Sequence, residues 1–193
     1  MYCIAFNGPP RSGKDTIADL IDEEFALRIT PTIRKSMVMP VRLAAFAMAG
    51  LLYSPDEYER IKDEPLAVFD NHSIREFMIN LMENHIKPCY GEAFAVKSMI
   101  QSLGTSIHLP GICLVSGLGF QIEVAELESA FGMERVLVAQ LERDGVDWGN
   151  DSRGYVKAHF HENTMRWWNR DGEQDILVAD ILTYCENILG WEI

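Results

Sequence analysis

The chain has 193 residues, of which 48% are hydrophobic and 24% are charged, and these values fit one globular domain with an ordinary core. Its 17 basic and 29 acidic residues give a net charge of −12. Because nucleic acids bind mainly to cationic surfaces that neutralise their phosphates, this acidity argues against a nucleic-acid partner. No stretch approaches the roughly 18 consecutive apolar residues of a membrane-spanning helix, and the N-terminus shows no signal-peptide pattern.

The four cysteines lie far apart in the sequence and lack the spacing of metal ligands. Cys3, Cys89, Cys113 and Cys185 each stand in an apolar stretch, which predicts buried free thiols. Free thiols and the lack of a targeting segment predict a protein of the reducing cytoplasm, with no membrane partner.

The first elements along the chain are a strand and a helix. Residues 2–6 form a short apolar run of the kind that is buried on both faces of a parallel sheet. Ile17, Ile21 and Phe25 follow at helical spacing, while acidic residues between them face outward. Residues 32–39 predict a second strand.

The middle of the chain is predicted to be helical. A helix is expected over 41–52. Two capping boxes, in which a serine precedes a glutamate by three residues, begin at Ser54 and at Ser73. The second opens an amphipathic helix that we expect to end at Pro88, and a further helix is expected over 92–103.

The second half of the chain alternates strands and helices, which predicts a parallel sheet with right-handed crossovers. Residues 143–154 contain several glycines and asparagines among charges, and this pattern predicts a mobile surface loop. The other expected elements are strands at 112–116, 135–141, 155–160 and 166–169, and helices at 121–131 and 175–189.

The turn between the first strand and the first helix carries a phosphate-binding signature. Residues 8–15 read Gly-Pro-Pro-Arg-Ser-Gly-Lys-Asp, which fits the P-loop pattern G-x-x-x-x-G-K in its strand–loop–helix setting. The glycines let successive N–H groups turn toward an anion, the helix adds its positive N-terminal dipole, and Lys14 supplies a point charge. The residues expected to contact the phosphates of ATP are Gly8, Pro9, Arg11, Ser12, Gly13, Lys14, Asp15 and Thr16.

Asp15 occupies the position at which many P-loops carry the serine or threonine that binds magnesium, and Thr16 comes next. A carboxylate can hold Mg²⁺ through water, so Asp15 and Thr16 are the predicted metal ligands. The alternative is that Asp15 is only a favourable negative charge at the N-terminus of a helix. The sequence leaves both interpretations open.

Residues 13–16, Gly-Lys-Asp-Thr, resemble the phosphate loop of phage-type deoxynucleoside monophosphate kinases of the P-loop nucleoside monophosphate kinase superfamily, and more distantly that of animal phosphomevalonate kinase. Further similar segments follow in the expected order and span most of the chain. They are Pro40-Val41-Arg42, Lys62-Asp63-Glu64-Pro65, Ser73-Ile74-Arg75-Glu76, Tyr90-Gly91-Glu92, His159-Phe160-His161-Glu162 and Asn169-Arg170-Asp171-Gly172.

The pattern of elements and this resemblance together imply an α/β fold, a P-loop three-layer sandwich with a central, mostly parallel sheet of about five strands, as a single domain over residues 1–193. The resemblance also implies a helical substrate-binding region at about 40–105 and a lid loop at about 143–154. A phage protein of this family would work in the host cytoplasm, and a homodimer is a candidate assembly.

Phosphoryl transfer requires alignment and charge neutralisation, so cationic side chains are the candidates for catalysis, foremost Lys14. Arg75 lies in the first turn of a capped helix, where a cation opposes the dipole, and this favours a role in binding the acceptor phosphate. Arg42 is either a second acceptor contact or a surface side chain. Arg143 and Arg153 flank the glycine-rich loop, so closure of a lid would bring them onto the phosphates, with Arg143 as the catalytic candidate. The remaining substrate-binding candidates are Lys62, Asp63, Tyr90 and Gly91.

Two histidines form the only other cluster of chemical interest. His159 and His161 lie two residues apart, next to Glu162. A metal site needs a third ligand at a recognisable spacing, and no such partner follows. A structural or lid role is therefore favoured for these residues.

One departure from the family lies at the end of the third strand. Where an Asp-x-Arg-Phe pattern is expected, the chain reads Gly117-Leu118-Gly119-Phe120. The resemblance implies that this aspartate organises magnesium and that this arginine adds charge to the site. Magnesium is therefore expected to depend on Asp15 and Thr16, with Glu123 as the only acid just after the strand.

The expected function is transfer of the γ-phosphate of ATP to a deoxynucleoside 5′-monophosphate, with Mg²⁺ as cofactor and no nucleic-acid partner. Two alternatives stay open. One is a P-loop kinase of a phosphorylated non-nucleotide such as phosphomevalonate. The other is a non-catalytic nucleotide-binding protein, which the glycines at 117 and 119 suggest.

Overall fold

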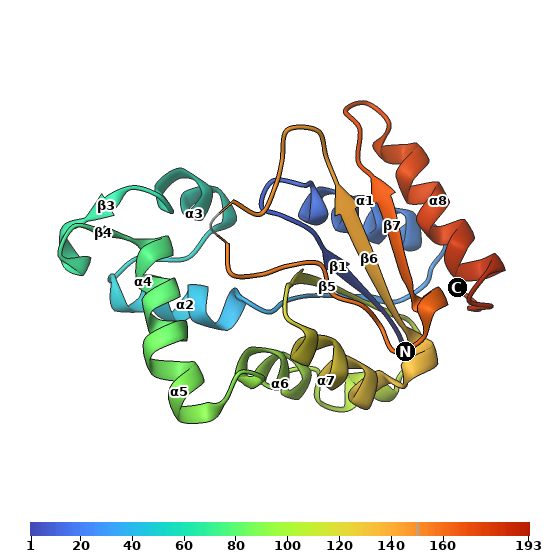
Figure 1. Ribbon diagram of the computed structural model, residues 1–193, viewed down its shortest axis with the longest axis horizontal. Coiled ribbons are helices and arrows are strands. Elements are labelled where there is room, and N and C mark those ends of the chain that lie inside the picture. The colour runs from blue at the N-terminus through green and yellow to red at the C-terminus, as the bar shows by residue number, and fades with distance from the viewer. Residues whose placement is uncertain (150) are drawn as a thin grey trace. The chain divides into compact units, whose positions relative to one another are not determined.

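The computed structural model describes residues 1–149 and 151–193 and divides into two compact units (Figure 1). The first unit comprises Met1–Met37 and Met99–Ile193, and the second comprises Val38–Ser98. The second unit is thus an insertion in the sequence of the first. The sequence predicted a helical region at about 40–105 in this part of the chain.

A five-stranded parallel sheet forms the centre of the first unit. All neighbouring strands are parallel, and they lie in the order β2-β5-β1-β6-β7. The predicted central sheet of about five mostly parallel strands is therefore confirmed, with β1 in the middle. The strands are β1 (Tyr2–Asn7), β2 (Thr32–Ser36), β5 (Ile112–Leu118), β6 (Val136–Glu142) and β7 (Thr164–Trp168).

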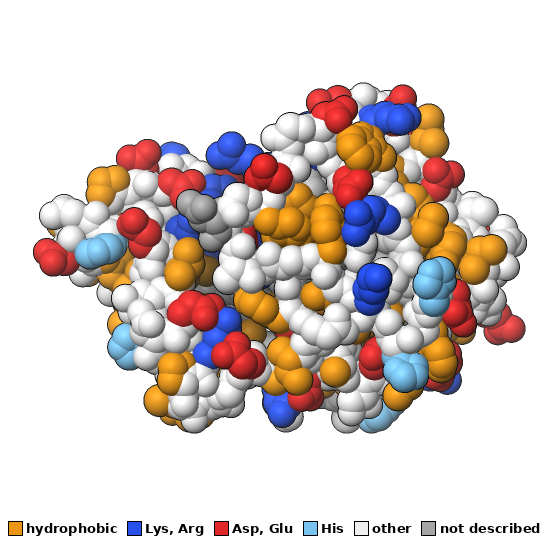
Figure 2. Space-filling view, in the orientation of Figure 1, with side chains coloured by type: hydrophobic (Ala, Val, Ile, Leu, Met, Phe, Trp, Pro, Cys, Tyr) orange, Lys and Arg blue, Asp and Glu red, His pale blue; other side chains and the backbone are white. Residues whose placement is uncertain are grey.

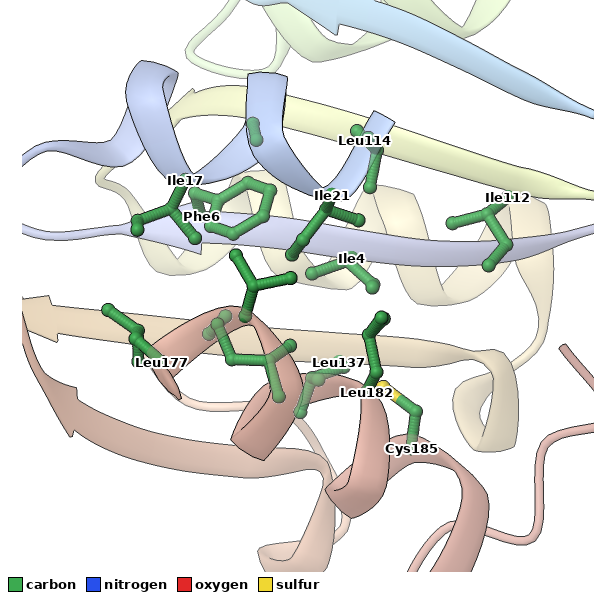
Figure 3. Close-up of a cluster of buried hydrophobic side chains, with 14 of the residues drawn as sticks. Ile4, Phe6, Ile17, Ile21, Ile112, Leu114, Leu137, Leu177, Leu182 and Cys185 are labelled. Carbon is green, nitrogen blue, oxygen red and sulfur yellow. The ribbon is translucent and has the colours of Figure 1, made fainter. Parts of the chain in front are cut away.

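Helices cover both faces of this sheet, because its central strands are apolar on both sides. On one face, α1 (Lys14–Leu27) and α8 (Gln174–Asn187) bury strand side chains that include Ile4 and Leu137 (Figure 3). On the other face, α7 (Gln121–Phe131) contacts β1 and β6 and is buried through Val124 and Leu127. The chain therefore has the three layers of the predicted α/β sandwich.

The remaining elements of the first unit are short. They are the 3₁₀ turns η3 (Gly104–His108), η4 (Met133–Arg135) and η5 (His161–Asn163). Helix α6 (Phe94–Gln101) carries the sequence boundary between the two units. In the described part of the chain, no helix combines the length and the apolar character that a membrane crossing requires.

The second unit is mainly helical. Its core joins Val41, Phe46, Tyr58, Ile74 and Met78, all of which are buried. Ser73 caps its longest helical run with a complete capping box, as predicted: its hydroxyl accepts the N–H of residue 76, and that glutamate accepts the N–H of Ser73. Its elements are α2 (Met39–Met48), α3 (Pro55–Ile61), β3 (Pro65–Leu66), η1 (Ala67–Phe69), β4 (His72–Ser73), α4 (Ile74–Asn80), η2 (Leu81–Ile86) and α5 (Lys87–Tyr90).

The prediction that this helical run ends at Pro88 was wrong. Residues Leu81–Ile86 wind as a π-helix, and Pro88 stands at the start of α5, which continues to Tyr90. In an α-helix the proline ring collides with the carbonyl four residues earlier. The wider π turn before Pro88 gives the chain room to continue, and such turns are a known way to absorb a local irregularity.

Residues 155–160 do not form the predicted strand. They run along the sheet without joining it, because side chains hold their backbone groups in place of a neighbouring strand. Asn7 accepts the N–H of Val156, and Thr164 accepts the N–H of Ala158. Gln140 donates to the carbonyl of Val156. The sequence of 155–160 does not show that its backbone partners are side chains from β1, from β6 and from the start of β7.

The cysteine prediction holds for three residues and fails for one. Cys3, Cys113 and Cys185 are buried free thiols, whereas Cys89 is exposed. Helix α5 is a short surface element in which only Lys87 is buried. The apolar neighbours of Cys89 in the sequence therefore do not place it in a core.

Candidate phosphate-binding site

The phosphate loop connects the carboxyl end of β1 to the N-terminus of α1. Gly13 is the N-cap of α1 and has a left-handed φ of +87°, a conformation that favours glycine. A Cβ on Gly8 would lie 2.5 Å from the carbonyl oxygen of Leu141, so only glycine fits beside β6. Both glycines of the predicted signature are therefore required by the geometry of the loop.

Asn169 holds the loop in this shape from the opposite side. Its side chain is almost fully buried and donates from Nδ2 to the carbonyl of Ser12 at 2.9 Å. A Cβ on Gly13 would lie 2.1 Å from the same Nδ2 atom. The backbone N–H of Asn169 donates to the carbonyl of Glu142, at the end of β6. The turn between β7 and α8 thus acts as a brace for the loop.

Lys14 places its ammonium group inside the loop. Nζ donates to the carbonyl of Gly8 at 2.8 Å, to that of Pro9 at 2.6 Å and to Ser12 Oγ at 3.3 Å. Burial, and then the nearby charge of Arg153, lower the pKa of Lys14 to about 8, against opposing effects of two aspartates. The group is thus a cation at neutral pH that a bound anion would stabilise.

A second set of residues meets the loop at the carboxyl end of β5. Asn7, the last residue of β1, is fully buried and donates from Nδ2 to the carbonyls of Leu118 and Gly154, both at 3.0 Å. Its Oδ1 accepts the N–H of Val156 at 3.1 Å. The N–H of Gly154 donates to the carbonyl of Gly119 at 3.1 Å. One buried amide therefore fixes the 154–156 segment across the ends of β1 and β5.

Arg153 and Asp151 form a charged pair next to this anchor. The guanidinium donates from Nη2 to Oδ2 at 2.6 Å and from Nε to both carboxylate oxygens at 2.9 and 3.1 Å. Although burial opposes its ionisation, hydrogen bonds from Arg153 and the charge of Lys14 lower the pKa of Asp151. The pair therefore lies within electrostatic range of the loop lysine.

The residues considered as magnesium ligands differ in their surroundings. Asp15 and Thr16 are exposed in the first turn of α1. Glu123 is buried instead, and its Oε2 accepts the N–H groups of Gly119 and Phe120 at 2.8 and 2.9 Å. This carboxylate caps the start of α7, and that role accounts for its position just after β5.

The two predicted lid arginines lie in different ion pairs. Arg143, just after β6, pairs with Asp171 at 2.5 Å on the turn that follows β7, whereas Arg153 pairs with Asp151. The predicted lid segment at 143–154 includes Asn150, which lies outside the described residues. A lid function of either arginine stays a prediction.

In the second unit, two of the predicted substrate residues lie beside the Tyr58 ring, and two more form an ion pair next to one of them. The guanidinium of Arg42 lies 3.9 Å from the centre of the Tyr58 ring, and Nζ of Lys62 lies 5.9 Å from it. Arg75 pairs with Asp63 at 2.6 Å, and its backbone N–H donates to the carbonyl of Lys62. The structure thus groups these charges inside the helical unit, and their role in substrate binding stays a prediction.

The other predicted residues are not part of this group. Tyr90 is 72% exposed at the end of α5, and Gly91 caps that helix with a φ of +89°. The ring of His159 packs edge-on against Phe160. Among the described residues, no three His, Cys, Asp or Glu side chains are placed to hold a metal ion. Figure 2 shows acidic and basic side chains interspersed over one face of the molecule.

Asn7, Asp151 and Asn169 are functional candidates that the sequence analysis did not single out for this site. Asn169 was noted only within a turn motif before the last helix. Asn7 directly precedes the first glycine of the signature, and a polar residue at the end of an apolar strand is the one local signal that could have indicated it. Asp151 carries no such signal, because it is far from the loop in the sequence and only folding of the chain brings it near Lys14.

Comparisons with protein-family models and with curated proteins found no match. Among solved structures, the chain is similar to shikimate kinase from Aquifex aeolicus VF5, with 15% identity and a TM-score of 0.43 over 98% of this chain and 99% of that one. At this identity and TM-score the likeness bears on neither activity nor substrate. The chain's own strand order and loop define it as an α/β sandwich with a P-loop between its central strand and first helix.

Proposed function

We propose that the chain is an ATP-dependent phosphotransferase that acts on a deoxynucleoside 5′-monophosphate. The observation that carries this proposal is the phosphate loop, in which Gly13 adopts a left-handed conformation, Asn169 fixes the backbone and Lys14 lies inside. Such a loop presents N–H groups, a helix dipole and one ammonium to an anion with several phosphates.

The residues at the loop also fit a magnesium ion that accompanies the nucleotide. Hard cations prefer oxygen ligands, and Mg²⁺ commonly takes one or two protein oxygens together with substrate phosphates. Asp15 offers a carboxylate and Thr16 a hydroxyl, both exposed in the first turn of α1. When bound, the ion would neutralise charge on the β- and γ-phosphates.

In the proposed reaction an oxygen of the acceptor phosphate forms a bond to the γ-phosphorus of ATP. The bond between the γ-phosphorus and the β–γ bridging oxygen breaks, and ADP leaves with that electron pair. Lys14 holds the charge that develops on the transferred group and the leaving oxygen. Arg75, with Arg42, binds the acceptor phosphate and fixes its orientation.

A deoxynucleotide is proposed as acceptor because of the resemblance of residues 13–16 and of the later segments to phage-type deoxynucleoside monophosphate kinases. A phosphorylated non-nucleotide is the second candidate, since the cationic side chains of Arg42 and Arg75 would suit a phosphate on either molecule. A coupled assay of ADP release separates these candidates when it is run with each deoxynucleoside monophosphate and with phosphomevalonate.

We expect ATP-dependent ADP release with at least one deoxynucleotide and none with phosphomevalonate. The matched control is Lys14→Ala, which must abolish the signal if it belongs to this protein. Release with phosphomevalonate alone would favour the second candidate. Tight ADP binding, with no ADP formed from ATP in the presence of any acceptor, would favour a non-catalytic nucleotide-binding protein.

A further inference from the structure

Arg153 occupies space that a side chain on Gly119 would otherwise fill. A Cβ built on Gly119 would lie 2.5 Å from Cγ and Cδ of Arg153 and 2.6 Å from its Cβ. Gly119 does not have a left-handed φ, so its backbone conformation is open to any residue. A glycine is therefore needed at position 119 to leave space for the Arg153 side chain. The backbone conformation at this position does not require it.

Gly117 has a different reason to be glycine. Its φ is +92°, and the pairing of β5 with β1 shifts register between Ala5 and Asn7, next to this residue. A positive φ at such an irregularity favours glycine on steric grounds. The end of β5 therefore carries two glycines, of which only Gly119 makes room for a cation from elsewhere in the chain.

The backbone next to Arg153 is fixed at the site. Asn7 holds the carbonyl of Gly154 and the N–H of Val156, and Gly154 donates to the carbonyl of Gly119. Arg153 is thus one residue from an anchored position, unlike a side chain at the tip of a lid that swings over its substrate.

The charges around this position suit a polyanion. Arg153 and Lys14 are two cations close enough for one to disfavour the charge of the other, and both are partly buried. Two neighbouring cations favour a bound anion, since each disfavours the charge of the other. Asp151 accepts from Nε and Nη2 of the guanidinium, and Asp15 and Asp151 both act on Lys14.

We propose that Arg153 is a fixed polyphosphate-binding residue of the loop, and that Gly119 and Asp151 are the positioning residues that hold it there. The cation absent from the end of β5 is supplied by a segment more than thirty residues later in the chain. Its ligand is the polyphosphate of the nucleoside triphosphate, so this inference rests on the proposed function and refines the same site.

A double-mutant cycle tests the link between Gly119 and Arg153, with inorganic tripolyphosphate as the probe and calorimetry as the measurement. Arg153→Gly should weaken binding by roughly ten- to a hundredfold. Gly119→Ala should cause most of the same loss, because its methyl group displaces the guanidinium. In the double variant, Gly119→Ala should add almost nothing to the effect of Arg153→Gly.

Arg28→Ala is the matched control, because Arg28 lies in the same unit, pairs with Glu24 and Glu186, and has no place in the proposed site. It should leave the affinity for tripolyphosphate within about twofold. If Gly119→Ala fails to fold, the double variant should fold again, since the colliding side chain is gone. A double variant that also fails to fold would overturn the proposal.

The acylation rate of Lys14 in the ligand-free protein provides a second readout, which a merely structural role would not move. The groups that act on its ammonium are Arg153, Asp15 and Asp151, besides burial. Arg153→Gly and Gly119→Ala should both raise the pH at which Lys14 becomes reactive, because a neighbouring cation is removed or displaced. Asp151→Asn should lower that pH, and it should weaken tripolyphosphate binding several-fold.

Additive losses in the cycle, or wild-type affinity of Arg153→Gly, would overturn the proposal even while Lys14→Ala abolishes binding. Failure of the proposed function is distinguishable from this result. In that case the wild-type protein would bind neither ADP nor tripolyphosphate, or Lys14→Ala would bind them as well as the wild type does.

Discussion

The phosphate loop and the carboxyl end of β5 lie in the same unit and are built in opposite ways. The signature of the loop lies in consecutive residues, with two glycines and a lysine at fixed spacing between a strand and a helix, and Asn169 braces it from a distant turn. The end of β5 is assembled from three distant segments, because Asn7 and the 151–156 stretch supply what its own residues lack.

This difference shows what a departure from the pattern of a resembling family can mean. The glycines at 117 and 119 looked, in the sequence alone, like the loss of two functional side chains. In the structure, Gly117 has a positive φ that favours glycine, and Gly119 leaves space for the Arg153 side chain. A missing residue type at one position therefore does not show that its charge is missing from the site.

The first prediction tests whether the loop contributes more to turnover and nucleotide binding than the end of β5 does. Lys14→Ala should bring turnover below detection and weaken ADP binding by roughly ten- to a hundredfold, because a charge-assisted phosphate contact is lost where charge builds up. ADP release and calorimetry measure the two effects. The Tm should stay near that of the wild type, and normal turnover in this variant would remove the phosphate-loop assignment.

Most of the fold could be predicted because its signals are local. The run 121–131 matched α7 residue by residue, and the glycine signature placed β1, the loop and α1 correctly. The site could be predicted only where its residues lie close together in the sequence. Asn7 and Gly154 are 147 residues apart, and a Cβ collision between Gly119 and Arg153 has no trace in either local sequence.

A second prediction extends the comparison to the helical unit, in which Arg75 pairs with Asp63. Arg75→Ala should lower kcat/KM for the acceptor by roughly ten- to a hundredfold and leave ADP affinity unchanged, because it removes a contact to the acceptor phosphate alone. Steady-state kinetics with varied acceptor measure this effect.

The control for that experiment is Arg60→Ala, which breaks an exposed ion pair with Glu57 in the same unit. It should change neither constant, since exposed pairs contribute little. If Arg75→Ala weakened ADP binding as much as acceptor use, Arg75 would belong to the donor site or to the scaffold.

A third prediction separates backbone strain from collision within the loop. Gly13→Ala and Gly172→Ala both place alanine at a left-handed φ, +87° and +81°, but only Gly13 faces an atom, Asn169 Nδ2 at 2.1 Å. Each should lose about 1 kcal/mol of unfolding free energy from strain. Gly13→Ala should lose about 1–3 kcal/mol more, because the buried amide must move away from Ser12. Urea denaturation measures both, and equal losses would show that Asn169 does not brace the loop.

The last prediction concerns pH and joins the two regions, because residues at the end of β5 act on the lysine of the loop. The pKa of Lys14 is lowered to about 8 by burial and by Arg153. Phosphates are fully ionised above about pH 7. Between pH 7 and 9 the lysine therefore loses the proton that an anion requires, and ADP affinity should fall by about tenfold. Calorimetry across this range measures the change, and binding near pH 9 should take up a proton.

Lys14→Arg provides the control, since a guanidinium stays charged throughout this range and should give a flat profile. The stability of the ligand-free protein should move in the opposite direction. The folded pKa lies below the unfolded value, so the unfolded chain binds more protons between about pH 8 and 10, and unfolding free energy rises with pH there. Measured against Lys14→Met, the wild type should therefore gain stability over the interval in which it loses ADP affinity. If both quantities fell together, the pH dependence would come from another group, and the electrostatic link between Arg153 and the loop would be lost.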